Sequence, residues 1–437
     1  MKMTESNSRT ADIRRMARTD EPAATALLAG LLLDLFSLKA EQVRINHDQY
    51  SLNSLNGFFD AGRQSFFFKF HQEDGEEAMS GEYYRADILA RAGLPVDQPL
   101  YMSVLPGEQI LIYRRRCDPR FSDVLRALDL QPDPAAESKA VAAEQALSAR
   151  VLSVYLETLH DVTSQEVAAE PIHRLFYDRL TDPQSGAIPG GRYKNFYVGQ
   201  QFLLPGVDLD WGTFSKARIV INGQRYRYSF GELFDLASVR LRPDKLADAG
   251  GVVAHGDAHN ANVWYTEADG RAELSYFDPA FAGQNVPSLL AEVKTTFHNI
   301  FAHPLWLYDP AEAEKRYSGL ARYEAGTLFL ETDWDLSAVR RKLLDVKADN
   351  MWRPLLSAMD ARGMLPHDWR RVIRLALFLC PTLVMNIRAG ASSHNPTSSL
   401  IAIAVAVMVG SEPETGSDMM SRFLDRIDPA FDCVSET

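Results

Sequence analysis

Hydrophobic and polar positions along residues 22–116 follow first a helical and then a strand-like pattern. Apolar residues recur at helical spacing over residues 22–40, which predicts one helix. Alternating runs over residues 43–52, then over the two halves of GFFDAGRQSFFFKFHQ and over LYMSVL and QILIYRR, predict five strands. A helix is expected between the last two pairs of strands, in DGEEAMSGEYYRADILARAGLP. Residues 43–116 therefore predict a β-β-β-α-β-β order, a small sheet with one helix.

The rest of the chain has a mostly helical pattern. Residues 118–163 have the strongest helical periodicity, and residues 164–250 are less regular, with a hairpin at ARIVINGQRYRYSF. A second hairpin is expected in VWYTEADGRAELSYFDP, and almost only helices from Pro287 to about residue 428. The predicted class is α+β and bilobal. It has a flexible leader over residues 1–22, a small nucleotide-binding N-lobe over 23–116, and a larger, mainly helical C-lobe over 117–437.

Composition narrows the function classes. The chain has 437 residues and a net charge of -12, which argues against wholesale nucleic-acid binding. Cys117, Cys380 and Cys433 are too far apart for a disulfide framework or a C-x-x-C metal pair, which favours a reducing compartment. The longest apolar runs, at residues 26–36 and 400–410, fall short of the roughly 20 residues that span a membrane. We therefore expect a cytoplasmic protein that binds neither nucleic acid nor membranes.

The most informative stretch is VVAHGDAHNANVW, residues 252–264, where polar side chains crowd between segments that look buried. Asp257 and Asn262 stand at the two ends of a short loop, and Asp278 ends the second strand of the following hairpin. Because a hairpin brings its two ends together, Asp278 should lie near Asn262. Two carboxylates and one amide oxygen are ligands that suit Mg²⁺, whereas zinc favours histidine and cysteine. The sequence therefore predicts a magnesium site at these strand ends.

The same residues carry a family resemblance. HGDAHNAN resembles the H-G-D-x-H-x-x-N brace of the aminoglycoside phosphotransferase and choline kinase family, small-molecule relatives of protein kinases. YFDPAFAG is similar to that family's metal-binding segment, and its D-P-x-F-A form is particularly similar to the methylthioribose and fructosamine kinase branches. The resemblance covers residues 43–116 and 140–300 and implies a protein-kinase-like fold. In GQNVPSLLAEVK the first aspartate of the family's G-D-P-x-x-D-L-A is missing, and Glu292 is a candidate for the second acidic position.

The resemblance also implies roles for the residues around the metal. Asp257 would accept or orient the proton of a substrate hydroxyl, and Asn262 with Asp278 would hold Mg²⁺ on the β- and γ-phosphates of ATP. His255 is expected to be a buried support, hydrogen-bonded to the backbone near Asp278. His259 could face the phosphates or the substrate, and its role is left open.

A second set of residues would bind ATP. Lys69, on the third strand, would neutralise phosphate charge, oriented by Glu82 in the next helix, with Glu76 and Glu77 as competitors. A solvated strand lysine and a surface helix glutamate are the alternatives for Lys69 and Glu82. The other expected contacts are a phosphate-covering turn with Asn56 and Gly57, and a hinge that meets adenine with the backbone of Ile112, Tyr113 and Arg114.

The function that follows is ATP- and Mg²⁺-dependent phosphorylation of a hydroxyl on a small molecule, such as an aminoglycoside, a sugar or an amino alcohol. One alternative is a catalytically silent, kinase-like module that binds a nucleotide without transferring phosphate. Another is a kinase of protein side chains, which is disfavoured because no A-P-E segment follows Asp278.

Overall fold

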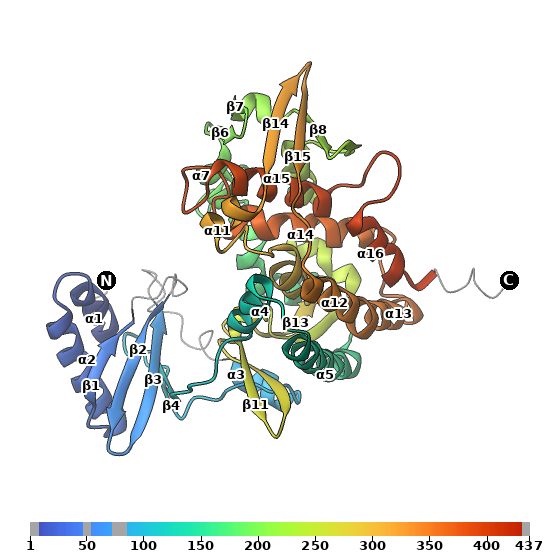
Figure 1. Ribbon diagram of the computed structural model, residues 1–437. Coiled ribbons are helices and arrows are strands. Elements are labelled where there is room, and N and C mark those ends of the chain that lie inside the picture. Colours follow the sequence, from blue (N-terminus) through green and yellow to red (C-terminus); the bar gives the residue numbers. More distant parts are fainter. Residues whose placement is uncertain (1–7, 47–53, 72–84, 431–437) are drawn as a thin grey trace. The chain divides into compact units, whose positions relative to one another are not determined.

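The computed structural model describes residues 8–46, 54–71 and 85–430 (Figure 1). The chain divides into two compact units, one formed by Met1–Asp87 with Val96–Asp118 and the other by Ile88–Pro95 with Pro119–Thr437. The boundary expected from the sequence lies between residues 116 and 117, and Ile88–Pro95 was expected in the N-lobe. The smaller unit holds a five-stranded sheet and the larger one is mainly helical, so the predicted α+β class is confirmed.

The sheet of the smaller unit is antiparallel throughout, in the order β1-β2-β3-β5-β4. Helix α3 (Ala86–Arg91) follows β3 in the chain, so the predicted β-β-β-α-β-β order is confirmed. That is the order expected for the small lobe of a protein-kinase-like fold. The strands are β1 (Glu41–Ile45), β2 (Ser54–Ala61), β3 (Gln64–His71), β4 (Tyr101–Ser103) and β5 (Ile110–Arg114).

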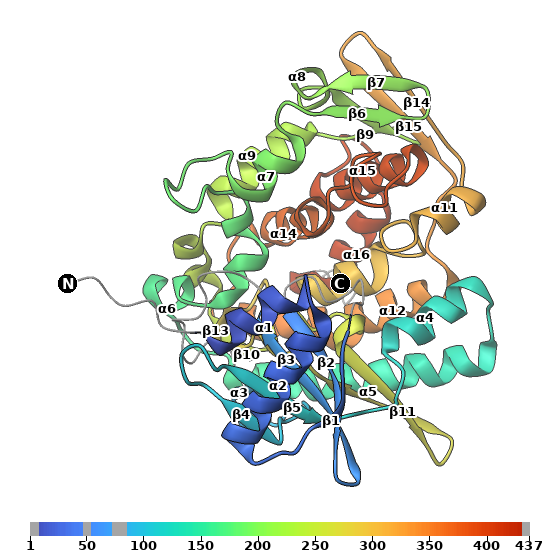
Figure 2. The same cartoon turned by 90° about the vertical axis from the view of Figure 1, so that its left-hand side faces the viewer.

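Two helices, α1 (Arg9–Ala17) and α2 (Glu21–Phe36), cover one face of this sheet, as both views show (Figures 1 and 2). The side chains of Ser8 and Asp20 cap them by accepting from the backbone N–H groups of Ala11 and Ala23, at 3.1 Å each. The residues that form the shared core are Ile13, Ala24, Leu28, Leu31 and Leu32 from the helices and Ile45, Leu55, Phe59, Phe66, Phe68, Phe70, Ile110 and Ile112 from the sheet.

Helix α1 differs from the flexible leader expected over residues 1–22. Its sequence, RTADIRRMA, is strongly polar, which suggested a solvated segment. Ile13 and Met16 nevertheless lie three residues apart, so a helix places both on one side, and both pack into the core under α2. Thr10 adds a buried contact by bonding the carbonyl of Gly107. Two apolar residues three apart give almost no periodic signal in the sequence.

Alternation along β3 decides where Lys69 lies. Phe66, Phe68 and Phe70 are buried against α1 and α2, and Lys69 falls between two of them in the sequence. Successive side chains of a strand point to opposite faces, so Lys69 lies on the face away from the helical layer, as expected. Its cross-strand neighbours are Asn56 of β2 and Leu111 of β5.

The larger unit contains three two-stranded pairs and one four-stranded sheet. The predicted hairpins at Asn222-Gly223 and Asp269-Gly270 are confirmed, with positive φ at all four turn residues. The pairs are β6 (Gln201–Leu204) with β7 (Val207–Asp210), β10 (Gly251–Ala254) with β13 (Gly283–Pro287), and β11 (Val263–Ala268) with β12 (Arg271–Tyr276). The four-stranded sheet has the order β14-β15-β8-β9, formed by β8 (Arg218–Ile221), β9 (Gln224–Arg225), β14 (Gly319–Glu324) and β15 (Thr327–Thr332).

The hairpin of β14 and β15 corrects the expectation of an almost purely helical chain after Pro287. The chain turns at Ala325 and Gly326, both with positive φ, and β15 pairs in parallel with β8. Leu328 and Leu330 are buried on one side of β15. The partner strand lies about a hundred residues earlier in the chain, so nothing local to residues 319–332 indicated the pairing.

Helices make up most of the larger unit. The long α5 packs against β10, β12 and α12, and Figure 2 shows α14 and α15 side by side. Almost every residue of α15 is buried, which explains its continuous apolar sequence. The helices are α4 (Phe121–Leu130), α5 (Pro134–Thr158), α6 (Ser164–Ala168), η2 (Pro171–Leu175), η3 (Tyr177–Arg179), α7 (Gly191–Tyr197), α8 (Trp211–Phe214), α9 (Phe230–Arg240), η4 (Pro243–Ala249), η5 (Asn260–Asn262), α10 (Val293–Thr296), η6 (Phe297–Phe301), α11 (Pro310–Arg316), α12 (Ala338–Lys347), η7 (Ala348–Trp352), α13 (Arg353–Ala361), α14 (Trp369–Val384), α15 (Pro396–Gly410) and α16 (Met419–Ile427).

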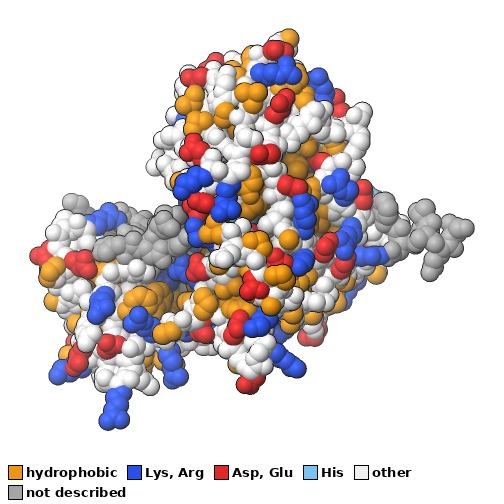
Figure 3. All heavy atoms as spheres, viewed as in Figure 1, with side chains coloured by type: hydrophobic (Ala, Val, Ile, Leu, Met, Phe, Trp, Pro, Cys, Tyr) orange, Lys and Arg blue, Asp and Glu red, His pale blue; other side chains and the backbone are white. Residues whose placement is uncertain are grey.

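The helices and the surface charge can also be compared with what membranes and charged partners require. Among the residues that the structure describes, no helix combines the length and the apolar character needed to cross a membrane. Acidic and basic side chains are intermixed over the face of the larger unit seen in Figure 3. On that face the acidic net charge of the chain is therefore not gathered into a patch of one sign.

Candidate active site

The polar stretch His255–Asn262 forms the loop between β10 and β11. Gly256, with φ +77°, lies against the second motif: a Cβ on it would come within 2.4 Å of the carbonyl oxygen of Phe281. Only glycine combines this backbone conformation with so close an approach. The H-G-D segment and the D-P-A-F-A segment are therefore packed directly on each other, as their roles in one site require.

A pair of glycine variants tests this packing. Gly256→Ala is expected to lower the free energy of unfolding by about 1–3 kcal/mol more than Gly270→Ala, because the added methyl group must displace backbone. Gly270 has almost the same φ, +75°, but open space around it, so it reports the conformational strain alone. Urea unfolding of both variants measures the difference, and equal losses would contradict the close packing.

The hairpin of β11 and β12 brings Asn262 and Asp278 to one end, as predicted. Val263 pairs with Tyr276, and the N–H of Phe277 donates to the carbonyl of Asn262 at 3.0 Å. Asp278 is the next residue, held at φ +56°. Left-handed backbone is tolerated by aspartate and asparagine better than by most residues.

The donor set at this end fits a magnesium ion. The amide nitrogen of Asn262 donates to the carbonyl of Asp257 at 2.9 Å, so its amide oxygen is the end left to face a ligand. The site would offer only two protein ligands, this amide oxygen and the carboxylate of Asp278. Such a small number suits Mg²⁺, because it commonly takes only one or two carboxylates and fills its other positions with water and phosphate oxygens. Within the described residues no group of three or more histidine, cysteine or acidic side chains could hold a metal by itself.

Asp257 is paired with a buried lysine. Nζ of Lys294 lies 3.4 Å from Oδ1 of Asp257, and the lysine side chain is only 4% exposed. Burial opposes ionisation of Asp257, but the positive charge of Lys294, with smaller effects of His259 and His255, holds its pKa below the ordinary value. Asp257 is therefore a carboxylate at neutral pH, able to accept a hydrogen bond from a hydroxyl.

His255 is the support that the sequence predicted. It is buried, and its Nε2 lies 3.0 Å from the carbonyl of Phe277, which can only accept, so Nε2 carries the proton. Its Nδ1 then accepts from the N–H of Asp257 at 3.4 Å. Burial lowers the pKa of His255, which keeps the ring neutral. The ring thus ties the backbone before Asp278 to the backbone of Asp257.

His259 was expected to face either the phosphates or the substrate. Its Nε2 is 3.7 Å from Oδ2 of Asp257 and 3.5 Å from the amide nitrogen of Asn262. Burial lowers its pKa, although the charge of Asp257 opposes that shift. His259 therefore faces the side of Asp257 that Lys294 does not contact.

The loop is braced by the helix that carries Lys294. The N–H of Asn260 donates to Oδ1 of Asn299 at 2.8 Å, and the carbonyl of Asn299 accepts from Arg340 at 2.6 Å. Arg340 also forms a fully buried ion pair with Asp129 at 2.7 Å. Asn299 lies in the π-helical turn η6, and such turns occur frequently at functional sites. Asn260 thus anchors the loop through its backbone.

Glu292 is held in place by neighbouring side chains. Its carboxylate accepts from the hydroxyls of Tyr155 and Thr295, at 2.8 and 2.7 Å, and pairs with Lys347 at 2.9 Å. Its side chain is 1% exposed. Glu292 therefore holds the start of α10 against α5 and α12, and its oxygens are already used.

Asn56 and Gly57, expected in a turn that covers phosphate, do not form a turn. Asn56 and Gly57 lie within β2, where they pair with Lys69 and Phe68. A Cβ on Gly57 would meet the carbonyl of Arg44 and the ring of Phe68, so this glycine serves close packing inside the sheet. Asn56 is the cross-strand neighbour of Lys69. Glu82 lies outside the described residues, as do Glu76 and Glu77.

The predicted hinge falls inside β5. The side chain of Ile112 is fully buried in the core, and its carbonyl accepts from the N–H of Leu100 at 2.7 Å. That carbonyl is therefore used within the sheet. Tyr113 and Arg114 lie beyond the last residue of β5 that pairs with β4, and both pair with β3, opposite Phe67 and Phe66.

Lys294 and His298 were missed by the sequence analysis. They lie one helical turn apart in α10 and η6, and both are buried. A signal existed, because AEVKTTFHNIF places a lysine and a histidine at i and i+4 among apolar residues, and such side chains need partners when buried. The partner, Asp257, lies in a different segment, which only the folded chain reveals.

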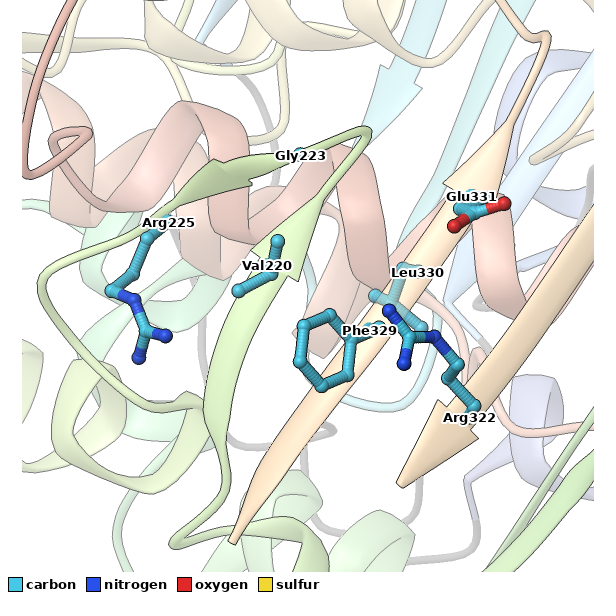
Figure 4. Close-up of a pocket in the computed structure, with 7 residues that line it drawn as sticks. All are labelled: Val220, Gly223, Arg225, Arg322, Phe329, Leu330 and Glu331. Atoms are coloured by element: carbon cyan, nitrogen blue, oxygen red, sulfur yellow. The ribbon is translucent and has the colours of Figure 1, made fainter. Parts of the chain in front are cut away.

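A pocket of about 260 Å³ lies elsewhere in the larger unit (Figure 4). It opens on the four-stranded sheet, where Arg322 lies over the ring of Phe329 at 4.0 Å. Its lining residues are Val220, Gly223, Arg225, Arg322, Phe329, Leu330 and Glu331, which include none of the predicted site residues. This pocket is therefore separate from the chemistry around Asp257.

No protein-family model matches the chain, and neither does the sequence of any curated protein. Among solved structures, it is similar to a spectinomycin phosphotransferase in complex with ADP and spectinomycin, at 12% identity over 87% of this chain and 98% of that one, with a TM-score of 0.39. A thermostable mutant of an aminoglycoside phosphotransferase matches at 12% identity over 86% of this chain and 98% of that chain, with a TM-score of 0.41. The microcompartment-associated aminopropanol kinase matches at 13% identity over 88% and 95%, with a TM-score of 0.40.

Proposed function

We propose that this protein is an ATP- and Mg²⁺-dependent phosphotransferase that acts on a hydroxyl of a small molecule. The observation that carries the proposal is the joining of two motifs at one end of the β11–β12 hairpin. Asn262 donates to the carbonyl of Asp257, and the residue before Asp278 bonds the carbonyl of Asn262. A base candidate and two oxygen donors for a cation are thus held by a few backbone-anchored bonds, as phosphoryl transfer requires.

Asp257 is the proposed catalytic base or orienting group. Its carboxylate is ionised at neutral pH, because the positive charge of Lys294 offsets the effect of burial on its pKa. The acceptor hydroxyl would donate to it and would be aligned for attack on the γ-phosphate. His255 keeps the loop rigid through its bonds to Phe277 and Asp257.

Asn262 and Asp278 are the proposed ligands of Mg²⁺. When bound, the ion would neutralise charge on the phosphates of ATP and fix their geometry. The protein's part is to hold the two oxygens still, through the hairpin ladder and through the bond from Asn262 to the carbonyl of Asp257.

Lys69 is the proposed phosphate-binding lysine. It lies on the face of its sheet away from α1 and α2, next to Asn56 across the strands. In the same proposal, Glu82 orients Lys69, and the backbone of Tyr113 and Arg114 contacts the base of ATP.

A panel of hydroxylated metabolites, incubated with ATP and Mg²⁺ and read by ADP release, tests this function. Acceptor-dependent ADP release is expected. Binding of ATP and Mg²⁺, seen as thermal stabilisation, without transfer to any acceptor of a broad panel would instead favour the silent nucleotide-binding module.

Asp278→Asn tests the metal site. The variant keeps a residue that tolerates φ +56° but removes the carboxylate charge, so the Mg²⁺ concentration for half-maximal activity should rise at least about 10-fold. A Mg²⁺ titration of ADP release measures it. Asp269→Asn, at the exposed far turn of the same hairpin and also with positive φ, is the matched control and should leave the titration unchanged. An unchanged Mg²⁺ requirement in Asp278→Asn would remove Asp278 from the metal site.

A further inference from the structure

The ammonium group of Lys294 joins Asp257 to a second buried group. It lies 3.4 Å from Oδ1 of Asp257 and 3.1 Å from Nε2 of His298, one turn further along the same helix. An ammonium can only donate, so Nε2 of His298 accepts from it. His298 is neutral, because burial, followed by the charge of Lys294, holds its pKa well below the ordinary value. Its single proton therefore sits on Nδ1.

This proton forms the next contact, with Tyr308. Nδ1 of His298 lies 2.5 Å from the hydroxyl of Tyr308, which accepts from it. The contacts thus diverge from Lys294, which faces Asp257 on one side and donates to His298 on the other, and His298 donates in turn to Tyr308.

The two oxygens of Asp257 have different surroundings. Oδ1 is buried and forms no hydrogen bond with good geometry, so the nearby ammonium of Lys294 is its counter-charge. Oδ2 lies on the side of His259, 3.7 Å from Nε2. An aspartate that orients a hydroxyl must present one defined oxygen, and here the charge of Lys294 distinguishes the two.

We propose that Lys294 is a positioning residue of the phosphotransfer site, which holds Oδ1 of Asp257 so that Oδ2 is presented to the acceptor hydroxyl, and that His298 and Tyr308 hold Lys294 in place. This inference rests on the proposed function of Asp257. It goes beyond that function by assigning each oxygen a role and by adding three residues outside both motifs.

The competing explanation is that Lys294 only stabilises the fold. A buried charge that loses its partner is costly, so a variant could lose activity simply by unfolding. Lys294→Met keeps most of the length of the apolar stem and removes the ammonium group, with its charge and its N–H donors. Lys294→Arg restores a positive charge at the same position and is the rescue variant.

Crystal structures of the wild type and of Lys294→Met give the first measurement, which needs no substrate. We expect Asp257 to leave its rotamer, or to occupy several, in Lys294→Met and to keep it in Tyr308→Phe, where only the far end of the chain of contacts is cut. An Asp257 side chain that stays in place in Lys294→Met would overturn the proposal, whether or not an acceptor has been found.

Kinetics with an acceptor from the panel give the second measurement. Per folded molecule, Lys294→Met should lower kcat roughly 10- to 100-fold, as expected for a misplaced catalytic group, with the KM for ATP unchanged. Lys294→Arg should recover part of that loss, and Tyr308→Phe should lose less than Lys294→Met. An unchanged kcat in Lys294→Met overturns the positioning role alone. If the wild-type protein transfers phosphate to no acceptor, the proposed function is overturned. The rotamer of Asp257 in Lys294→Met then still shows whether Lys294 positions Asp257.

Discussion

Asp257→Asn is expected to lower kcat for phosphoryl transfer about 10³-fold, with ATP binding and folding retained. The asparagine keeps the size and can keep the backbone bonds to His255 and Asn262, but it cannot take a proton from a hydroxyl. It also removes the charge that pairs with Lys294. Steady-state ADP release with the best acceptor of the panel measures kcat. Thermal stabilisation by ATP and Mg²⁺ checks that the nucleotide still binds.

The matched control is Asp269→Asn, which makes the same chemical change at an exposed turn and should leave kcat unchanged. The pKa of Asp257 lies below the ordinary value of an aspartate, about 3.9, so its ionisation should not limit the rate between about pH 6 and pH 9. Full activity of Asp257→Asn would rule out Asp257 as base or orienting group, and the function would then need another carboxylate.

Local patterns were enough to predict the parts of the fold that depend on neighbours in sequence. Hairpins turning at Asn222-Gly223 and Asp269-Gly270 follow from residues that accept positive φ, and the second hairpin already implied that Asp278 meets Asn262. Lys69 could be placed on its face of the sheet from the alternation of Phe68 and Phe70 alone. The support role of His255, by contrast, came from the family resemblance of the motif that contains it.

What the sequence could not supply depends on partners far apart in the chain. The parallel pairing of β15 with β8 joins strands about a hundred residues apart, and Lys294 reaches Asp257 from a helix outside both motifs. Asn56 and Gly57 look like a turn in NSLNG, but pairing with β3 keeps them extended. In each case a tertiary contact overrode a local preference.

The buried triad of Lys347, Glu144 and Glu292 gives the largest expected effect on stability. Nζ of Lys347 lies 3.0 Å from Glu144 and 2.9 Å from Glu292, and all three side chains are at most 5% exposed. Burial disfavours the ammonium, but the two carboxylates more than offset it and raise the pKa of Lys347. A raised pKa means that this stabilisation is complete below the unfolded-state pKa of about 10.4 and is lost only as the pH rises through the higher folded value. It is therefore fully present at neutral pH.

Lys347→Met should lower the free energy of unfolding by about 3–5 kcal/mol at pH 7, because it leaves two buried carboxylates facing each other without a counter-charge. Those carboxylates would bind protons more readily in the folded variant, so the loss should shrink as the pH falls toward 5. Urea unfolding at both pH values measures this. Lys342→Met is the matched control on the same helix, since Lys342 also pairs with a glutamate of α5, Glu137, at 2.7 Å but is 48% exposed. It should cost less than about 1 kcal/mol. Equal losses of unfolding free energy in the two variants would mean that burial of the triad adds nothing to stability. The start of α10, where Glu292 lies close to Lys294, would then be held by packing alone.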